Sequence, residues 1–173
     1  MHSTLHKASI WTTVVMTPLL LSACANMADI PAGASLAQVQ AQFGAPDLTC
    51  TDRDGNQRAI WSMQPNGQYA WGANIDSAGN TDKVVPVLTN QNFRKLDQGS
   101  WNQEQVRCEF GLPAEIGSVG LPSSRQNVWS YRYKENGVWN SLMHVYFDIY
   151  TGEVTRYHPG PDPMYDRESF PFF

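Results

Sequence analysis

The stretch VQAQFGAP at residues 39–46 returns at residues 106–113 as VRCEFGLP, with Val, Phe, Gly and Pro in the same places. Val and Phe four residues apart lie on one face of a helix. The Gly after Phe supplies a left-handed C-terminal cap, and the Pro two residues later prevents the helix from continuing. Each copy therefore predicts a short helix that ends at Phe and leads into a strand.

The two predicted helices also begin alike. Ser35 and Gln38 have the spacing of a capping box, and Asn102 and Gln105 repeat that spacing with Asn as the cap residue. Each helix is therefore predicted to start just after its cap residue.

Strand segments also repeat after each helix. The segment AIWSM at residues 59–63 is matched by NVWSY at residues 127–131, and an Asn-Gly pair, a strong hairpin signal, follows each of them. Strands are expected near residues 48–51, 58–64, 68–76 and 83–88, and again near 115–119, 127–134, 138–150 and 153–157. The order of these elements predicts a tandem duplication of one α+β unit, with short helices packed on a three- to four-stranded antiparallel sheet.

The predicted division of the chain follows from this duplication. The first, degenerate unit covers residues 35–89, and the second covers residues 90–158, beginning with a linker and a short lead-in helix. Within the second unit, residues 142–148 are apolar at both alternating sets of positions, which predicts a strand covered on both faces. Residues 159–173 form a tail rich in Pro and aromatic residues.

The N-terminus has the pattern of an export signal. Lys7 precedes an apolar run from Ile10 to Leu21 that is short for a membrane span, so residues 1–23 are predicted to be a signal peptide. The following LSAC at residues 21–24 resembles a bacterial lipobox, which implies a covalent lipid on Cys24 and a tether over residues 24–34. Ala25, rather than Asp, follows the cysteine, and this resemblance implies sorting to the outer membrane. The alternative is an ordinary signal peptide that contains a cysteine.

Two further cysteines, Cys50 and Cys108, lie at non-equivalent positions of the two units. In an oxidising compartment an even pair is compatible with a disulfide, which would join one unit to the other. The alternative is two independent buried thiols. Neither cysteine has a second Cys or His at ligand spacing, so no metal site is expected.

Composition narrows the classes of ligand. The chain has 173 residues, 42% of them hydrophobic, and a net charge of −4. An acidic chain without clusters of Lys and Arg argues against nucleic acid and anionic lipid as main ligands.

The search for catalytic residues gives no candidate. The histidines after the signal are His144 and His158, and the nucleophile, phosphate-loop and metalloprotease motifs are missing from the sequence. The carboxylates of Asp52, Asp54, Asp76 and Asp148 fall at predicted turns, where Asp caps its own backbone. We therefore expect no catalytic site and no cofactor other than the lipid on Cys24.

Aromatic side chains are the sharper candidates, as partner-binding residues. Trp and Tyr are enriched at interaction hot spots, although core packing is the alternative for each of them. Those flanking the Asn-Gly turns are Tyr69, Trp71, Tyr133 and Trp139, and the tail adds Tyr165 and Phe173. The tail is expected either to pack on the protein's own surface or to anchor a partner.

The second unit resembles a known family. A helix ending in Phe-Gly-x-Pro, then Trp129-Ser130-Tyr131, then Val145-Tyr146-Phe147-Asp148 with Gly152 and Val154, is similar to the SmpA/OmlA (BamE-like) outer-membrane lipoprotein domain. The resemblance is close over residues 92–158 and weaker over residues 33–88, where Trp61-Ser62-Met63 stands in place of Trp-x-Tyr. It implies helices against a three-stranded antiparallel sheet and a non-catalytic role as an adaptor. Two tandem units of similar architecture also make up the β-lactamase inhibitory protein.

Two functions are expected from these features. The first is a periplasm-facing adaptor or scaffold lipoprotein of the outer membrane that binds envelope proteins, with the β-barrel assembly machinery as the candidate partner. The second is an inhibitor-like module that binds a periplasmic or secreted enzyme through a concave double sheet. Neither function involves nucleic acid.

Overall fold

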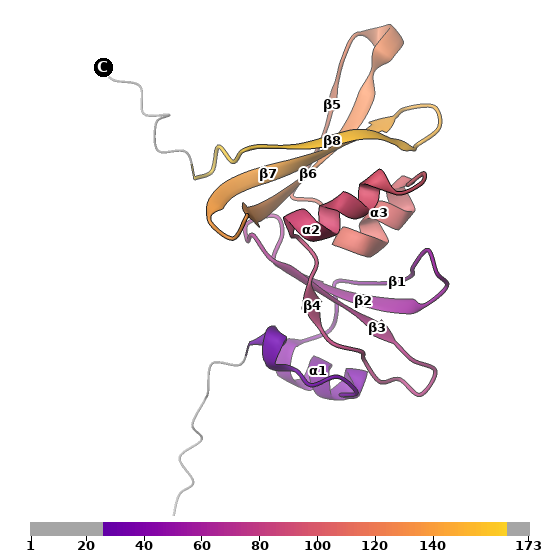
Figure 1. The fold of residues 1–173 in the computed structure, drawn as a ribbon, viewed down its shortest axis with the longest axis vertical. Helices are drawn as coiled ribbons and strands as arrows, with labels where there is room; N and C mark the ends of the chain where they lie inside the picture. The colour runs from indigo at the N-terminus through magenta and orange to yellow at the C-terminus, as the bar shows by residue number, and fades with distance from the viewer. Residues whose placement is uncertain (1–25, 166–173) are drawn as a thin grey trace, which may run out of the picture.

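A computed structural model describes residues 26–165 and shows an α+β fold with two four-stranded antiparallel sheets (Figure 1). The strands of each sheet pair in chain order, so both sheets are meanders, consistent with two tandem units. The first sheet consists of β1 (Leu48–Thr51), β2 (Gln57–Ser62), β3 (Ala70–Ile75) and β4 (Val85–Pro86), and the second of β5 (Glu115–Val119), β6 (Gln126–Glu135), β7 (Trp139–Asp148) and β8 (Val154–Pro161).

Short helices precede each sheet, and one 3₁₀ turn lies between β5 and β6. The α-helices are α1 (Leu36–Phe43), α2 (Asn90–Phe93) and α3 (Gln103–Phe110), and the 3₁₀ helices are η1 (Met27–Asp29), η2 (Arg94–Asp97) and η3 (Pro122–Ser124). None of the helices within residues 26–165 is long and apolar enough to cross a membrane.

The repeated helix signals form the caps that they predict. Both reciprocal hydrogen bonds of the capping box are present at Ser35 of α1 and at Asn102 of α3. The helices end at Gly44 (φ 85°, ψ 176°) and Gly111 (φ 86°, ψ −164°). The positive φ is as predicted, but ψ near 180° places both in a region that essentially only Gly adopts, rather than in the left-handed helical region.

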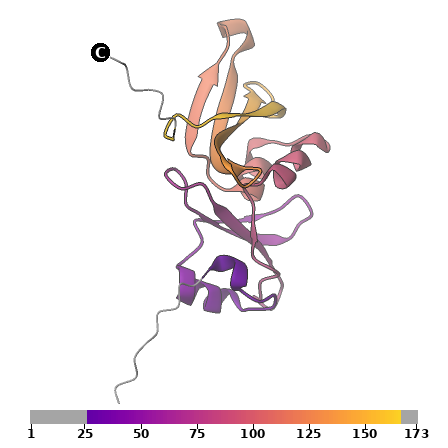
Figure 2. The ribbon, with the colours of Figure 1, turned by 60° about the vertical axis from the view of Figure 1, so that its left-hand side comes forward.

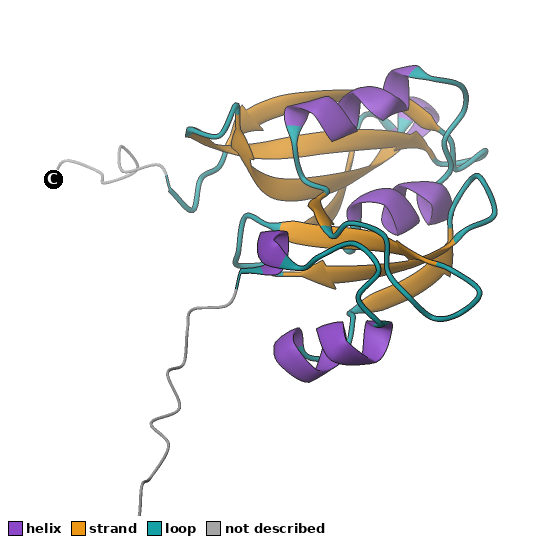
Figure 3. Ribbon diagram, turned by 60° about the horizontal axis from the view of Figure 1, so that its bottom comes forward, coloured by secondary structure: helices purple, strands orange, loops and turns teal. Residues whose placement is uncertain are grey.

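The elements stack in layers (Figures 2 and 3). Helix α1 covers the outer face of the first sheet, where Val39, Ala59 and Trp61 belong to a small core. The helices of the second unit lie between the two sheets, and a larger core joins residues of both sheets, among them Ile60 and Tyr131, to Phe93 and Phe110 of these helices. The second unit's helices therefore serve both sheets.

Strand β7 is buried on both faces, as predicted for this segment. Met143, Val145 and Phe147 belong to the larger core, while Leu142 and Tyr146 are buried on the opposite face.

The tether predicted for residues 24–34 is wrong for the part that the structure describes. Met27 and Ile30 are buried in the first unit's core. The N–H of Gly33 donates to the carbonyl of Thr81 at 2.8 Å. These apolar side chains fill the end of a small core, so residues 26–34 belong to the first unit.

The tail predicted from residue 159 also begins too early. Pro159 and Pro161 lie in β8, opposite Met143 and Ser141 of β7. Strand β8 is an edge strand, where the N–H group that Pro lacks would face solvent. The sheet therefore continues through the first two prolines of the predicted tail.

Candidate interaction surface

An apolar groove of about 960 Å³ lies on the outer side of the first unit. It is formed where the end of α1, the start of the described chain and the β2–β3 hairpin meet. Its lining is mostly aromatic and sulfur-containing, with a few polar groups: Asn26, Met27, Phe43, Ala45, Asp47, Trp61, Ser62, Met63, Tyr69 and Trp71.

The β2–β3 hairpin holds one wall of this groove. Trp61 and Trp71 are cross-strand partners, and the N–H of Met63 donates to the carbonyl of Tyr69 at 2.9 Å. The indole N–H of Trp61 donates to Gly44 O at 3.0 Å, which fixes the end of α1 against the sheet. Met63 and Tyr69 are nevertheless 58% and 44% exposed. The groove is therefore built on fixed backbone and presents apolar side chains to its surroundings.

The groove arises from the unequal surroundings of the two copies. Phe110 at the end of α3 is fully buried because that helix lies between two sheets. Its counterpart Phe43 at the end of α1 is only partly buried and lines the groove, because α1 packs on one sheet. The repeated Phe is thus covered by a second sheet in the second unit, whereas in the first unit it lies at the open groove.

The predicted partner-binding residues differ in their positions: two line the groove, two are exposed elsewhere, one is buried, and one lies outside the described residues. Tyr69 and Trp71 line the groove, whereas Trp139 is 68% exposed at the start of β7 and does not. The prediction for Tyr133 is wrong: its side chain is fully buried and packs edge-on against Phe93, because alternation along β6 directs it toward the helix layer. The hydroxyl of Tyr165 approaches the carbonyl of Asn66 at 3.5 Å. Cys24 and Phe173 lie outside the described residues.

Sequence reasoning missed several groove residues, namely Met27, Phe43, Trp61 and Met63. One signal pointed toward them: Met63 stands where the family motif has Tyr. The side chain at this position of the second unit, Tyr131, is fully buried. The position at which the first unit lacks the motif's Tyr is therefore also the position at which its side chain is exposed instead of buried.

The two units are joined by a disulfide between Cys50 of β1 and Cys108 of α3, with Cα atoms 5.8 Å apart. Beside it, the buried carboxylate of Glu109 is paired with Lys95 and lies 3.6 Å from Arg58. Arg58 Nε also donates to Cys108 O at 3.2 Å. These contacts fix α3 against the first sheet.

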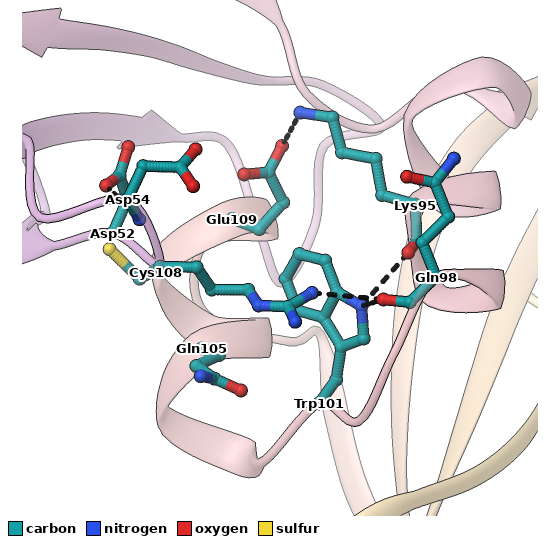
Figure 4. Close-up of a pocket in the computed structure, with 9 residues that line it drawn as sticks. Asp52, Asp54, Lys95, Gln98, Trp101, Gln105, Cys108 and Glu109 are labelled. Atoms are coloured by element: carbon teal, nitrogen blue, oxygen red, sulfur yellow. Dashed lines mark hydrogen bonds and ion pairs between the residues drawn. The ribbon is translucent and has the colours of Figure 1, made fainter.

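A polar cavity of about 480 Å³ lies next to this junction (Figure 4). The guanidinium of Arg53 stacks 4.3 Å above the Trp101 ring and donates to Gln98 O. The Trp101 indole donates to the carbonyls of Lys95 and Gln98. These contacts connect Arg53, in the turn after β1, to Gln98 and Trp101 of the second unit, which indicates a role in joining the units.

A second junction lies at the β2–β3 hairpin. The side-chain amide of Gln64 donates to Arg132 O at 2.8 Å and accepts from Arg132 N at 3.2 Å, so it occupies the place of a strand beside β6. Arg132 Nη1 donates to Pro65 O, and its Nε lies 3.1 Å from the buried carboxylate of Asp162. The hairpin, the second sheet and the chain after β8 are therefore tied together at one point.

Three of the polar groups considered for catalysis, His144, Asp76 and Asp148, have structural partners. His144 Nδ1 lies 2.8 Å from the hydroxyl of Ser130. Asp76 and Asp148 accept hydrogen bonds from backbone N–H groups of their own turns, and those bonds lower the pKa of each carboxyl. Within residues 26–165, no group of three His, Cys, Asp or Glu side chains is placed to hold a metal ion.

Comparisons with known protein families, with curated proteins and with solved structures find no match to this chain.

Proposed function

We propose that the protein is a non-catalytic adaptor lipoprotein at the periplasmic face of the outer membrane, which binds envelope proteins through the apolar groove of its first unit. The single observation that carries this proposal is the groove itself, with Met63 and Tyr69 exposed on its wall. Exposed aromatic and Met side chains around a recess are typical of interaction hot spots.

The position of the groove supports the membrane part of the proposal. Asn26 lines the groove, and Cys24 precedes it by two residues, which span at most about 7 Å of extended chain. A lipid on Cys24 would hold the groove near the membrane surface, where envelope complexes are available. Thioether-linked and amide-linked acyl chains together anchor a protein firmly, whereas one chain does not.

The resemblance to the BamE-like domain supports the adaptor class. The helix that ends in Phe-Gly-x-Pro and the antiparallel meander after it agree with that family's order of elements, although each sheet here has four strands. The β-barrel assembly machinery is accordingly the first partner to test. Fold similarity alone does not transfer a function, so the proposed binding role is assigned to the groove.

Inhibition of a secreted or periplasmic enzyme has less support. That function relied on Tyr69, Trp71, Tyr133 and Trp139 on a concave double sheet. Tyr133 is buried, and a helix layer separates the two sheets.

Affinity purification of the full-length protein from envelopes in mild detergent tests the proposal. We expect recovery of membrane-associated envelope proteins with the native chain, and their loss with Cys24→Ala and with the groove variant Met63→Asp/Tyr69→Asp. Trp139→Asp is the matched control, because Trp139 is exposed but lies outside the groove. Equal recovery with the groove variant and the native chain would contradict the proposal, and recovery of one soluble enzyme would favour inhibition.

A further inference from the structure

The groove has a close neighbour within the same chain. The residues after β8 first lie beside β6 and β7: Asp162 N–H donates to Asn140 O at 3.2 Å, and the Asp162 side chain is buried against Arg132, which also donates to Pro65 O of the β2–β3 loop. Three residues later, the Tyr165 hydroxyl reaches Asn66 O in the hairpin loop. The described chain therefore ends next to the loop whose two flanking residues, Met63 and Tyr69, form the groove wall.

The segment that follows Tyr165 has the composition to fill such a groove. Residues 166–173 have the sequence DRESFPFF, with Phe at 170, 172 and 173. Eight extended residues span at most about 26–29 Å. Met63 and Tyr69, at the base of the hairpin, each lie three residues from Asn66, which is at most about 10 Å along the chain. The phenylalanines are therefore within reach of the groove.

We infer that the C-terminal segment 166–173 occupies the apolar groove of the first unit when no partner is bound. This inference rests on the proposed function, because it adds a regulatory element to the same site. A tethered segment has an effective concentration in the millimolar range, so a weak contact between the phenylalanines and the groove is sufficient. A partner must then displace the segment, and the partner's apparent affinity equals its intrinsic affinity multiplied by the fraction of molecules whose groove is free.

Photo-crosslinking of the full-length protein tests the inference. The photoreactive residue p-benzoylphenylalanine replaces Phe172, and the purified lipoprotein is irradiated in detergent and digested for mass spectrometry. We expect an adduct within one chain between position 172 and a peptide containing Met63 or Tyr69. The adduct should be lost with Met63→Asp/Tyr69→Asp. We expect this variant to keep the native circular dichroism spectrum, because both positions are exposed. The same photoreactive residue at Tyr150, an exposed turn position, is the control and should give no groove adduct.

A second measurement needs no photoreactive residue. Oxidation of Met63 by peroxide, relative to Met164, should be faster in Phe170→Ser/Phe172→Ser/Phe173→Ser than in the native protein, because methionine oxidation follows exposure. The triple variant should also recover more envelope partner than the native chain. Crosslinks from position 172 only to a second copy, to detergent or to other surfaces, or an unchanged Met63 oxidation rate, would overturn the inference. If the groove variant fails to recover the partner but position 172 gives no groove adduct, the proposed function is supported and only the inference about segment 166–173 is overturned.

Discussion

At the scale of single residues, Phe110 and Phe43 show how one repeated position has two roles. Phe110 is fully buried, with its ring centroid 4.7 Å from that of Phe93, whereas Phe43 borders the groove. Phe110→Ala should lower the free energy of unfolding by about 3–5 kcal/mol, the usual range for a fully buried Phe. Phe43→Ala should cost clearly less, because less of its surface is buried. Urea denaturation of both variants measures the difference, and equal losses would contradict the layered core.

His144 gives the protein a pH-dependent stability. Burial, and secondly the neighbouring His158, lower the pKa of His144 below 6.5, against an opposing effect of Glu115. The unfolded chain therefore takes up a proton before the folded one does, and the free energy of unfolding should decrease as the pH falls below about 6.5. His144→Gln should remove this part of the slope. A ring titration by NMR with its midpoint at or above 6.5 would contradict this prediction.

At the scale of elements, the repeated glycine caps provide a matched pair. Gly44 and Gly111 share a positive φ, but a Cβ at Gly44 would meet nothing within 4 Å, whereas at Gly111 it would meet Ile60 Cγ2 at 3.0 Å. Gly44→Ala should cost about 1–3 kcal/mol of stability from backbone strain. Gly111→Ala should cost more, because α3 must also shift against the first sheet. Thermal unfolding of the two variants measures both losses of stability. A loss for Gly111→Ala that is equal to or smaller than that for Gly44→Ala would contradict the packing of α3 on β2.

The elements also show what sequence can predict. Capping boxes, helix ends and most strands depend on local spacing, and the two helices and strands β1 and β5 fall where they are expected. The Asn-Gly pairs predicted two hairpin turns, and only the second pair has the expected backbone conformation. Asn136 and Gly137 have the expected positive φ, but Gly67 does not, because tertiary contacts of Gln64 and Pro65 determine that loop. The burial of Tyr133 and the packing of residues 26–34 depend likewise on neighbours distant in sequence.

At the scale of the whole molecule, the disulfide joins the units across a separation of 58 residues. Closing a loop of this length in the unfolded chain predicts a stabilisation of about 4 kcal/mol. Cys50→Ser/Cys108→Ser should lower the guanidinium midpoint accordingly, while the native protein should lose the same amount on reduction. A double variant as stable as the oxidised protein would show that the bond contributes nothing beyond the packing of α3.

The same scale explains why the groove was only partly predictable. Its residues come from η1, the end of α1 and two strands with their adjoining loops, and only Tyr69 and Trp71 of them were predicted from the sequence to bind a partner. The exposure of the other lining residues depends on the position of the second unit's helices between the two sheets, which local sequence patterns do not specify. That arrangement buries one copy of the repeated Phe and leaves the other open.

The most direct test of the adaptor role is photo-crosslinking in intact envelopes from Tyr69 on the groove wall, with Tyr150 as the exposed control position. We predict an intermolecular adduct with an envelope protein from position 69, absent from position 150 and lost when Cys24→Ala removes the proposed anchor. Identical adducts from both positions, or adducts at Tyr69 that never extend beyond the chain itself, would contradict binding of envelope proteins through the groove.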